Sequence, residues 1–259
     1  MHELDEFYRN RRNRLIEYPE DEQLQDLTKD WVKKAFDKNY MYNFDWLGRP
    51  IIQMPEEQVM LQELIWDVKP DLIIETGIAH GGSLIFSASM LALLAFCDAV
   101  TTKKPLLPFD VTRKVLGIDI EIRKHNRDLI NAHPLSSLIT MIEGSSTDPK
   151  VYSQVQAIAK EHKNVMVLLD SNHTADHVLA ELEIYSPLVS LDSYCIVFDT
   201  GIEYLPKDYF PDRPWCPGNS PQTAIEQFLL GNDCFQVDYS KSSKSLITAS
   251  PQGYLRRMV

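Results

Sequence analysis

An apolar run that leads directly into a cluster of glycines constrains this chain more than any other feature. Residues 71–75 read DLIIE, and three glycines follow at Gly77, Gly81 and Gly82. Ser83 then opens an apolar stretch over residues 84–96 that is long enough for a helix. In α/β proteins, a strand, a glycine turn and a helix in this order present backbone N–H groups and a helix N-terminus to a ligand.

The spacing of this segment, E-x-G-x-x-x-G-G-S from Glu75 to Ser83, differs from two familiar phosphate-binding patterns. It is not the dinucleotide pattern G-x-G-x-x-G, and it lacks the Lys-Ser/Thr pair of a nucleotide phosphate loop. Glu75 stands where a group with hydroxyls or an amine would be held. Two interpretations are equally open at this point, a ligand-binding loop and a plain glycine turn.

Composition limits the class of protein further. The chain has 259 residues, 44% of them hydrophobic, so it can bury one substantial core, and one elaborated α/β domain is the default. The formal net charge of −11 at pH 7 argues against nucleic-acid binding. The first residues lack the apolar region of a signal peptide.

No membrane span is expected, and the cysteines favour a reducing compartment. The longest apolar stretch, residues 84–100, is interrupted by Ser87, Ser89 and Asp98, which is typical of a core helix. The four cysteines form no CxxC pair and fit reduced thiols better than a disulfide framework. We therefore expect a cytoplasmic protein.

The first 55 residues are expected to form a helical and loop extension to a domain at residues 56–259. Apolar residues within 1–40 recur at roughly helical spacing, so this segment would cover the core, pack on a partner subunit or form a lid. The amphipathic stretch at residues 15–36 must be buried somewhere, and together with the family resemblance described below it leads us to expect a homo-oligomer. Residues 40–55 are aromatic and predict an ordered loop, whose Tyr42 and Trp46 would line a pocket or fill the core.

Apolar runs alternate with helix-forming stretches along the rest of the chain. Five strands are expected at residues 71–75, 114–120, 138–142, 165–169 and 193–198. Residues 98–113 read as a connecting loop, and two last strands are expected at residues 235–239 and 245–249. This order predicts an α/β fold with a mostly parallel sheet, an antiparallel terminal strand and helices on both faces.

Two polar positions near the ends of the early strands suggest a nucleoside. Asp119 ends the second strand, where a carboxylate can accept hydrogen bonds from both hydroxyls of a ribose. The alternative is a cap for the following helix, and the upstream glycine turn favours the ribose. The loop with Ser145, after the third strand, would then lie against the base.

Three functional groups follow the fourth and fifth strands. Asp170 ends the fourth strand, His173 comes three residues later, and Asp199 ends the fifth strand. Ends of neighbouring strands lie about 5 Å apart, and two carboxylates that close repel each other unless a cation lies between them. Oxygen ligands of this kind suit Mg²⁺. Independent caps or surface ion pairs are the alternative, which the added imidazole disfavours.

Residues 200–222 form a long loop rich in proline and aromatic residues. Loops of this length in compact domains are usually functional lids or disordered. The aromatic side chains argue against disorder. This loop is therefore expected to shape a ligand pocket.

Several stretches, read together, resemble the cephalosporin hydroxylase/rhamnosyl O-methyltransferase family. They are WLGRPIIQMPEEQ, IIETGIAHGGS, GIDIEIR, LLDSNHTADHVLAEL, PGNSPQTAIEQFL and GYLRR, in chain order over most of the sequence. The resemblance implies a Rossmann-like methyltransferase sheet that binds S-adenosylmethionine. Related enzymes that modify macrolide sugars use magnesium.

The resemblance also implies roles for individual residues. The cofactor loop corresponds to Glu75, Gly77, Gly81, Gly82 and Ser83, with Asp119 on the ribose and Ser145 beside the adenine. Asp170 and Asp199 correspond to the metal carboxylates, and His173 to the proposed catalytic base. One position departs from the pattern, because relatives carry Glu-Asp where this chain has Phe198-Asp199. Metal binding would then be weaker, recruit Glu203 or be lost.

The function implied is an O-methyltransferase. It would move a methyl group from S-adenosylmethionine to a hydroxyl of a sugar or small natural product, with Mg²⁺ and a His173 base. Two other classes remain open. A nucleotide- or NAD-binding oxidoreductase would need a pyrophosphate fingerprint, which the sequence lacks, and a non-catalytic binding protein on the same fold is favoured mainly by Phe198.

Overall fold

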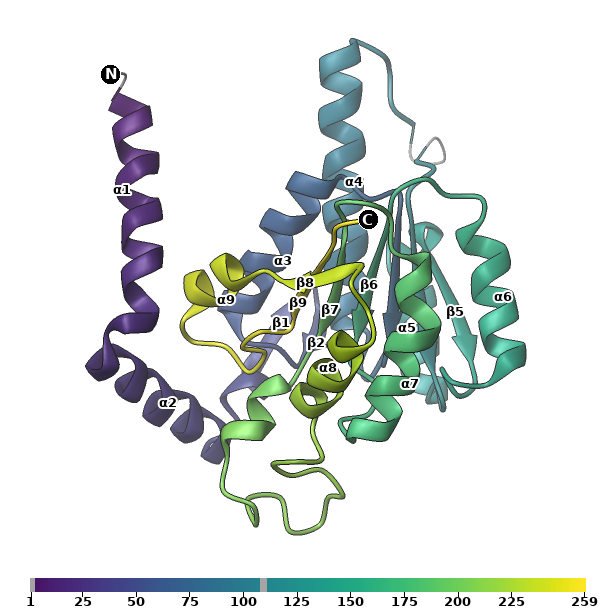
Figure 1. Cartoon of the computed structure of the whole chain (residues 1–259). Coiled ribbons are helices and arrows are strands. Elements are labelled where there is room, and N and C mark those ends of the chain that lie inside the picture. The colour runs from purple at the N-terminus through teal and green to yellow at the C-terminus, as the bar shows by residue number, and fades with distance from the viewer. Residues whose placement is uncertain (1–2, 108–110) are drawn as a thin grey trace.

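The computed structural model describes residues 3–107 and 111–259, and its centre is a seven-stranded sheet in the order β5-β4-β3-β6-β7-β9-β8 (Figure 1). The strands are β3 (Leu72–Thr76), β4 (Lys114–Asp119), β5 (Ile139–Glu143), β6 (Val165–Leu169), β7 (Tyr194–Val197), β8 (Phe235–Val237) and β9 (Tyr254–Arg257). The first five are parallel, whereas β9 runs antiparallel to both β7 and β8. The predicted fold class is confirmed.

The strand order reverses between β3 and β6, and this positions the site. The chain moves outward from β3 to β4 and β5, then returns to place β6 on the other side of β3. Every residue of β3 and β6 is buried, as expected for apolar strands covered on both faces. Ligands of open α/β sheets bind beyond the carboxyl ends of the strands at such a reversal.

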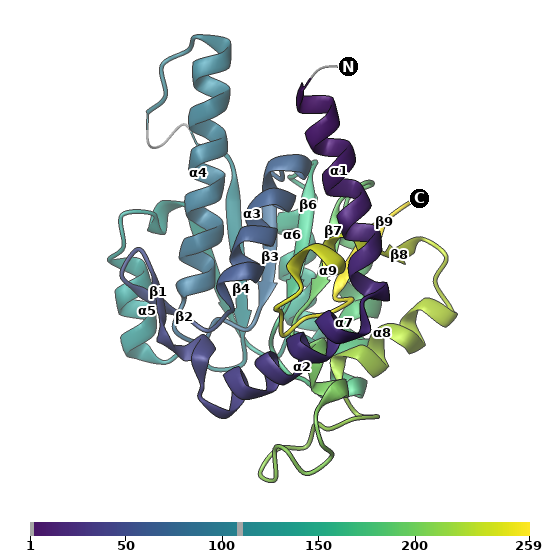
Figure 2. The same cartoon turned by 90° about the vertical axis from the view of Figure 1, so that its left-hand side faces the viewer.

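Helices cover both faces of the sheet (Figures 1 and 2). One core cluster joins a sheet face to α3 (Pro55–Val68), α4 (Gly82–Thr102) and α5 (Lys124–Asn131). The other joins the opposite face to α6 (Pro149–Ala159), α7 (Ala175–Tyr185) and α8 (Pro221–Leu230). Among the described residues, α4 alone is long and apolar enough to span a membrane, and 50% of its most apolar window is buried, as in a core helix.

The N-terminal segment consists of α1 (Glu3–Glu17), α2 (Glu22–Asp37) and a hairpin of β1 (Phe44–Trp46) and β2 (Arg49–Ile51). The loop expected at residues 40–55 thus contains a short sheet. A small apolar cluster of Ala35, Met41, Met54 and Ala249 joins this segment to the end of the chain. Helix α1 has no buried residue and stands apart from the sheet beside α9 (Tyr239–Ser245) (Figure 2).

Two sequence expectations about irregular segments need correction. The strand expected at residues 245–249 does not form. Helix α9 occupies residues 239–245, and Asp238 caps it by accepting a hydrogen bond from Ser240 N. The Ala249 N–H is donated to the Glu57 side chain and not to a neighbouring strand. The last strand is β9. The loop expected at residues 98–113 begins later, since α4 continues to Thr102, and residues 108–110 of that loop lie outside the described part.

Candidate active site

The glycine turn after β3 is packed so tightly that its glycines leave no room for a Cβ atom. Gly77 has φ +90°, and a Cβ there would overlap the carbonyl of Asp170. A Cβ on Gly82 would overlap the backbone of Pro50 in β2, and one on Gly81 would overlap the side chain of Ile130. The turn therefore passes between the end of β6 and the N-terminal hairpin.

Glu75 lies buried at the end of β3, below this turn. Its side chain is 2% exposed, and Oε1 accepts a hydrogen bond from the Ser83 hydroxyl. Its other oxygen, Oε2, has no partner among the described residues. Burial raises the pKa of the Glu75 carboxyl to about 8, against the lowering effect of Ser83. An unpaired buried oxygen beside a glycine turn fits a ligand that donates a hydrogen bond there.

Asp119 holds the glycine turn itself. Its Oδ2 accepts hydrogen bonds from the backbone N–H groups of Ile78 at 2.8 Å and Ala79 at 3.3 Å. Its Oδ1 accepts from Glu121 N at 3.1 Å. Helix α5 begins beyond Arg123, so Asp119 is not its N-cap. Each carboxylate oxygen has two lone pairs, so Asp119 can hold the turn and still accept from hydroxyls.

A cavity of about 140 Å³ lies between this turn and the hairpin, in the position expected for the cofactor. It is lined by residues predicted from sequence and by others that were missed: Pro50, Ile51, Ile52, Gln53, Gly77, Ile78, Ala79, His80, Gly82, Ser83, Asp119, Asp170 and Ser171. Ser145 lines neither this cavity nor the next one described, and its hydroxyl pairs with Thr147 at 3.0 Å.

The hairpin side of this cavity was not predicted. Arg49 is 8% exposed and donates hydrogen bonds to the His80 carbonyl and to Asn126 Oδ1. Asn126 in turn donates to the Ala79 carbonyl at 2.8 Å. This pair fixes residues 79–80 of the turn. The only hint in the sequence was an arginine within an otherwise aromatic and apolar loop.

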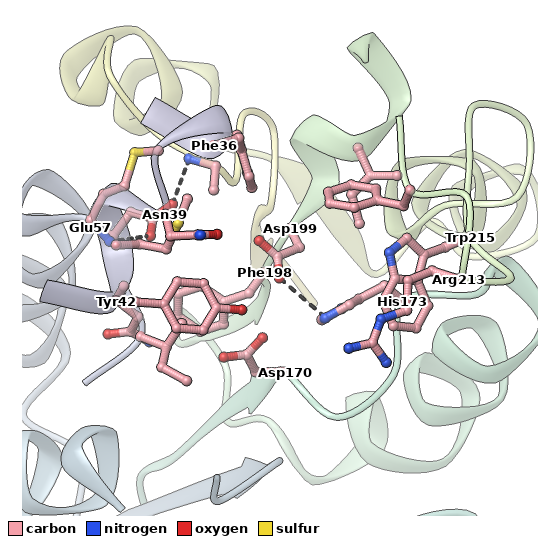
Figure 3. Close-up of a pocket in the computed structure, with 17 residues that line it drawn as sticks. Phe36, Asn39, Tyr42, Glu57, Asp170, His173, Phe198, Asp199, Arg213 and Trp215 are labelled. Carbon is pink, nitrogen blue, oxygen red and sulfur yellow. Dashed lines mark hydrogen bonds and ion pairs between the residues drawn. The ribbon is translucent and has the colours of Figure 1, made fainter. Parts of the chain in front are cut away.

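A second cavity of about 230 Å³ lies over the ends of β6 and β7. Figure 3 shows Asp170, Phe198 and Asp199 between Tyr42 on one side and His173 with Trp215 on the other. Tyr42 thus lines the pocket as expected. Trp46 does not, because it packs on Phe86 at 4.7 Å and donates to Ser89 within the core.

The structure brings the three predicted functional groups together in this cavity. Asp170, His173 and Asp199 each offer one ligand atom, and these atoms lie within 4.8 Å of one another. His173 Nε2 is 3.3 Å from Asp199 Oδ2, and the imidazole ring lies edge-on to Trp215 at 4.8 Å. Burial, and then the charge of Asp199, raise the pKa of the Asp170 carboxyl well above its usual range. A cation between the carboxylates would relieve this repulsion, so the donor set fits a divalent metal.

Glu203 does not take the place of the acidic residue that the family resemblance implies at Phe198. Phe198 is 5% exposed in the cavity wall. Glu203 accepts hydrogen bonds from Gly218 N, Ser220 Oγ and Thr223 Oγ1 at the start of α8, so the suggestion that it joins the metal site is not supported.

Glu57 is a further carboxylate in the wall of this cavity, and sequence reasoning missed it within a helical stretch. It is 3% exposed, and its pKa is raised by burial. Its oxygens accept from Thr248 Oγ1 at 2.7 Å, Ala249 N at 2.8 Å and Met54 N at 3.1 Å. These hydrogen bonds connect α3 to residues 248–249, so Glu57 has a structural role.

A known protein family matches most of this chain, including all residues that line the cofactor cavity. The profile of the family "Rhamnosyl O-methyltransferase/CmcI" matches residues 38–258. The rhamnosyl O-methyltransferase of Mycobacterium tuberculosis (strain ATCC 25618 / H37Rv) is 27% identical over 238 residues, which are 88% of this chain and 86% of that protein. The protein of the same name from Mycobacterium leprae (strain TN) is 26% identical over 239 residues, 88% and 91% of the two chains.

Solved structures agree on the fold. CmcI with Mg and SAM has a TM-score of 0.55 at 18% identity, over 84% of this chain and 78% of that one. CmcI with SAH has a TM-score of 0.57 at 18% identity, over 85% and 84% of the chains. The expectation of an S-adenosylmethionine-dependent O-methyltransferase is confirmed. The chain belongs to the rhamnosyl O-methyltransferase/CmcI family.

Proposed function

We propose that this enzyme methylates a hydroxyl of a sugar, free or within a natural product, with the help of a divalent cation and a histidine base. The observation that carries the proposal is the convergence of Asp170, His173 and Asp199 in a cavity that shares Asp170 with the cofactor cavity. The names of the mycobacterial relatives support a rhamnose-type acceptor, and the CmcI structure with Mg supports a cation.

Each part of the site has a defined task in this proposal. S-adenosylmethionine supplies an electrophilic methyl group when bound, and a cation held by Asp170 and Asp199 would make the acceptor hydroxyl more acidic. His173 takes the hydroxyl proton as the oxygen–carbon bond forms and the carbon–sulfur bond breaks. Asp199, 3.3 Å from the imidazole, stabilises the imidazolium that results. Aromatic side chains on both sides, Tyr42 and Trp215, exclude water and hold the sugar.

The N-terminal segment completes the acceptor cavity. Phe36, Asn39, Met41 and Tyr42 come from residues 1–55 and form one wall of it. Tyr209 in the long loop donates to Asp37 at 2.6 Å, which ties α2 to the loop that carries Trp215. We therefore propose residues 1–55 as an extension that helps to bind the acceptor, and residues 56–259 as the methyltransferase domain.

Helix α1 also supports a homo-oligomer. It buries no residue, and it exposes large apolar side chains, among them Phe7 at 54% and Ile16 at 68%. Such surfaces are usually covered by another protein. A second copy of this chain is the partner we propose.

Calorimetric titration tests the cofactor side of this function. S-adenosylmethionine and S-adenosylhomocysteine should bind with and without magnesium, because the glycine turn and Asp119 do not need the ion. NAD and ATP should not bind. Binding of NAD in preference to S-adenosylmethionine would contradict the assignment.

A further inference from the structure

Three residues line both cavities: Ile52, Gln53 and Asp170. This junction is where a methyl group held in the cofactor cavity would meet an acceptor oxygen. Asp170 already has a role in the proposed function and Ile52 is apolar, so Gln53 is the polar residue at the junction without an assigned role. We propose that the Gln53 amide binds a second hydroxyl of the acceptor, next to the one that is methylated, and thereby selects acceptors with a vicinal diol. This proposal rests on the proposed function.

The Gln53 side chain is buried without a partner. It is 4% exposed, and its buried Oε1 has no hydrogen-bond partner among the described residues. Buried side-chain polar atoms are almost always paired, because leaving one unpaired destabilises the folded protein. Because Gln53 also lines both cavities, a bound ligand can supply the partner for this oxygen.

The backbone around Gln53 is fixed from both sides, and this holds the base of its side chain at the junction. The preceding strand β2 packs directly on Gly82, where even a Cβ would overlap Pro50 and Ile51. The following residue, Met54, donates its N–H to the Glu57 side chain at 3.1 Å. Gln53 is therefore held at the junction before any ligand binds, as a pre-organised contact should be.

The chemistry of the junction separates the roles of two acceptor hydroxyls. The proton of the methylated hydroxyl goes to His173, so that hydroxyl is not the donor to Gln53. A neighbouring hydroxyl can donate to the amide oxygen throughout the reaction, and no bond to Gln53 forms or breaks. Sites that hydrogen-bond a substrate hydroxyl reject analogues that lack it, because the polar group is then left unpaired.

The test compares Gln53→Met with the matched control Gln58→Met. Gln58 lies on the next helix, is 9% exposed and lines neither cavity, and its Nε2 has no partner in the described part of the chain. Both variants should keep or raise the Tm of the ligand-free protein, because each removes an unpaired buried amide. The affinity for S-adenosylhomocysteine should change less than threefold in Gln58→Met. A loss of tenfold or more in Gln53→Met alone would assign the Gln53 amide to the cofactor and overturn its role in acceptor binding.

Kinetics then separate the two variants. The probes are methyl α-L-rhamnopyranoside and its 2-, 3- and 4-deoxy analogues. The product of the parent glycoside first identifies the methylated position, and the analogue that lacks that hydroxyl is set aside. Wild type should prefer the parent glycoside by at least tenfold in kcat/KM to one analogue that lacks a neighbouring hydroxyl, and Gln53→Met should abolish that preference while Gln58→Met keeps it. Preference retained in Gln53→Met, or a Tm several degrees below wild type in that variant alone, would overturn the role of Gln53. A wild type that binds the cofactor but methylates no glycoside would contradict the proposed acceptor instead, and the Tm comparison would still decide whether Gln53 is a structural group.

Discussion

Nε2 of His173 lies 3.3 Å from Oδ2 of Asp199, so one carboxylate faces both the proposed base and the proposed metal position. The two roles are therefore coupled through Asp199. Loss of its charge removes a metal ligand and also the group that stabilises the imidazolium. Loss of the imidazole removes only the base. This difference allows mutations at the two positions to be told apart.

Phe198 provides a test of the metal site. Phe198→Glu restores the acidic pair that the family resemblance implies and should lower the Kd for Mg²⁺ or Mn²⁺ by about tenfold, since one further charged ligand contributes about 1.4 kcal/mol. Without metal, the new carboxylate beside Asp170 should lower the Tm. Manganese binding followed by electron paramagnetic resonance measures this directly, with Phe198→Leu as the control. Equal affinity in Phe198→Glu and Phe198→Leu would place the ion elsewhere.

Glu75 should make stability depend on pH in a defined direction. Its folded pKa is raised to about 8, above its ordinary value, so the folded protein binds the proton more tightly than the unfolded chain. The stabilisation by the protonated form is complete at low pH and is lost as pH rises towards 8, at up to about 1.4 kcal/mol per pH unit. Glu75→Gln should therefore flatten the fall in unfolding free energy between pH 5 and 8. Urea titrations at several pH values measure the unfolding free energy of both proteins. An equal fall in this free energy between pH 5 and 8 for wild type and Glu75→Gln would contradict the prediction.

Asp119 should contribute to cofactor affinity in two ways. Asp119→Ala removes the proposed ribose contact and the bonds to Ile78 and Ala79, so affinity for S-adenosylmethionine should fall by about 1.5–3 kcal/mol, roughly 10- to 150-fold. Asp119→Asn keeps one oxygen for the turn and should lose less. Calorimetry on both variants checks this order, and unchanged affinity in Asp119→Ala would remove the residue from the site.

Deletion of residues 1–17 tests the role of α1. The helix lies away from both cavities, so cofactor affinity should be retained. Light scattering at micromolar concentration should show an oligomer for the full chain and a smaller species for the truncated one. A full chain that is already monomeric would exclude the proposed assembly.

The sequence was sufficient for those parts of the site that follow directly from strand ends. Glu75, Asp119, Asp170 and Asp199 each terminate an apolar run, and parallel strands bring their carboxyl ends to one edge. Residues whose role depends on distant packing were missed. Gln53 reaches the junction only because β2 packs on Gly82, and this approach of two backbones leaves no periodic signal in the sequence.

The error at residues 245–249 has a similar origin. An apolar, β-branched run favours a strand locally, but Glu57 accepts hydrogen bonds from Thr248 and Ala249 and takes their polar groups away from the sheet. The partner lies almost two hundred positions earlier in the chain, so local propensity could not reveal it.

The most direct measurement of the central claim is methyl transfer from labelled S-adenosylmethionine to a rhamnoside by wild type, by His173→Ala and by wild type in excess chelator. Cofactor affinity and folded fraction are measured on the same samples. We expect His173→Ala to lower the rate per folded molecule by about 10²- to 10⁴-fold, and chelation to abolish transfer, with cofactor binding intact in both. Full activity in His173→Ala or in excess chelator would contradict the mechanism at Asp170, His173 and Asp199.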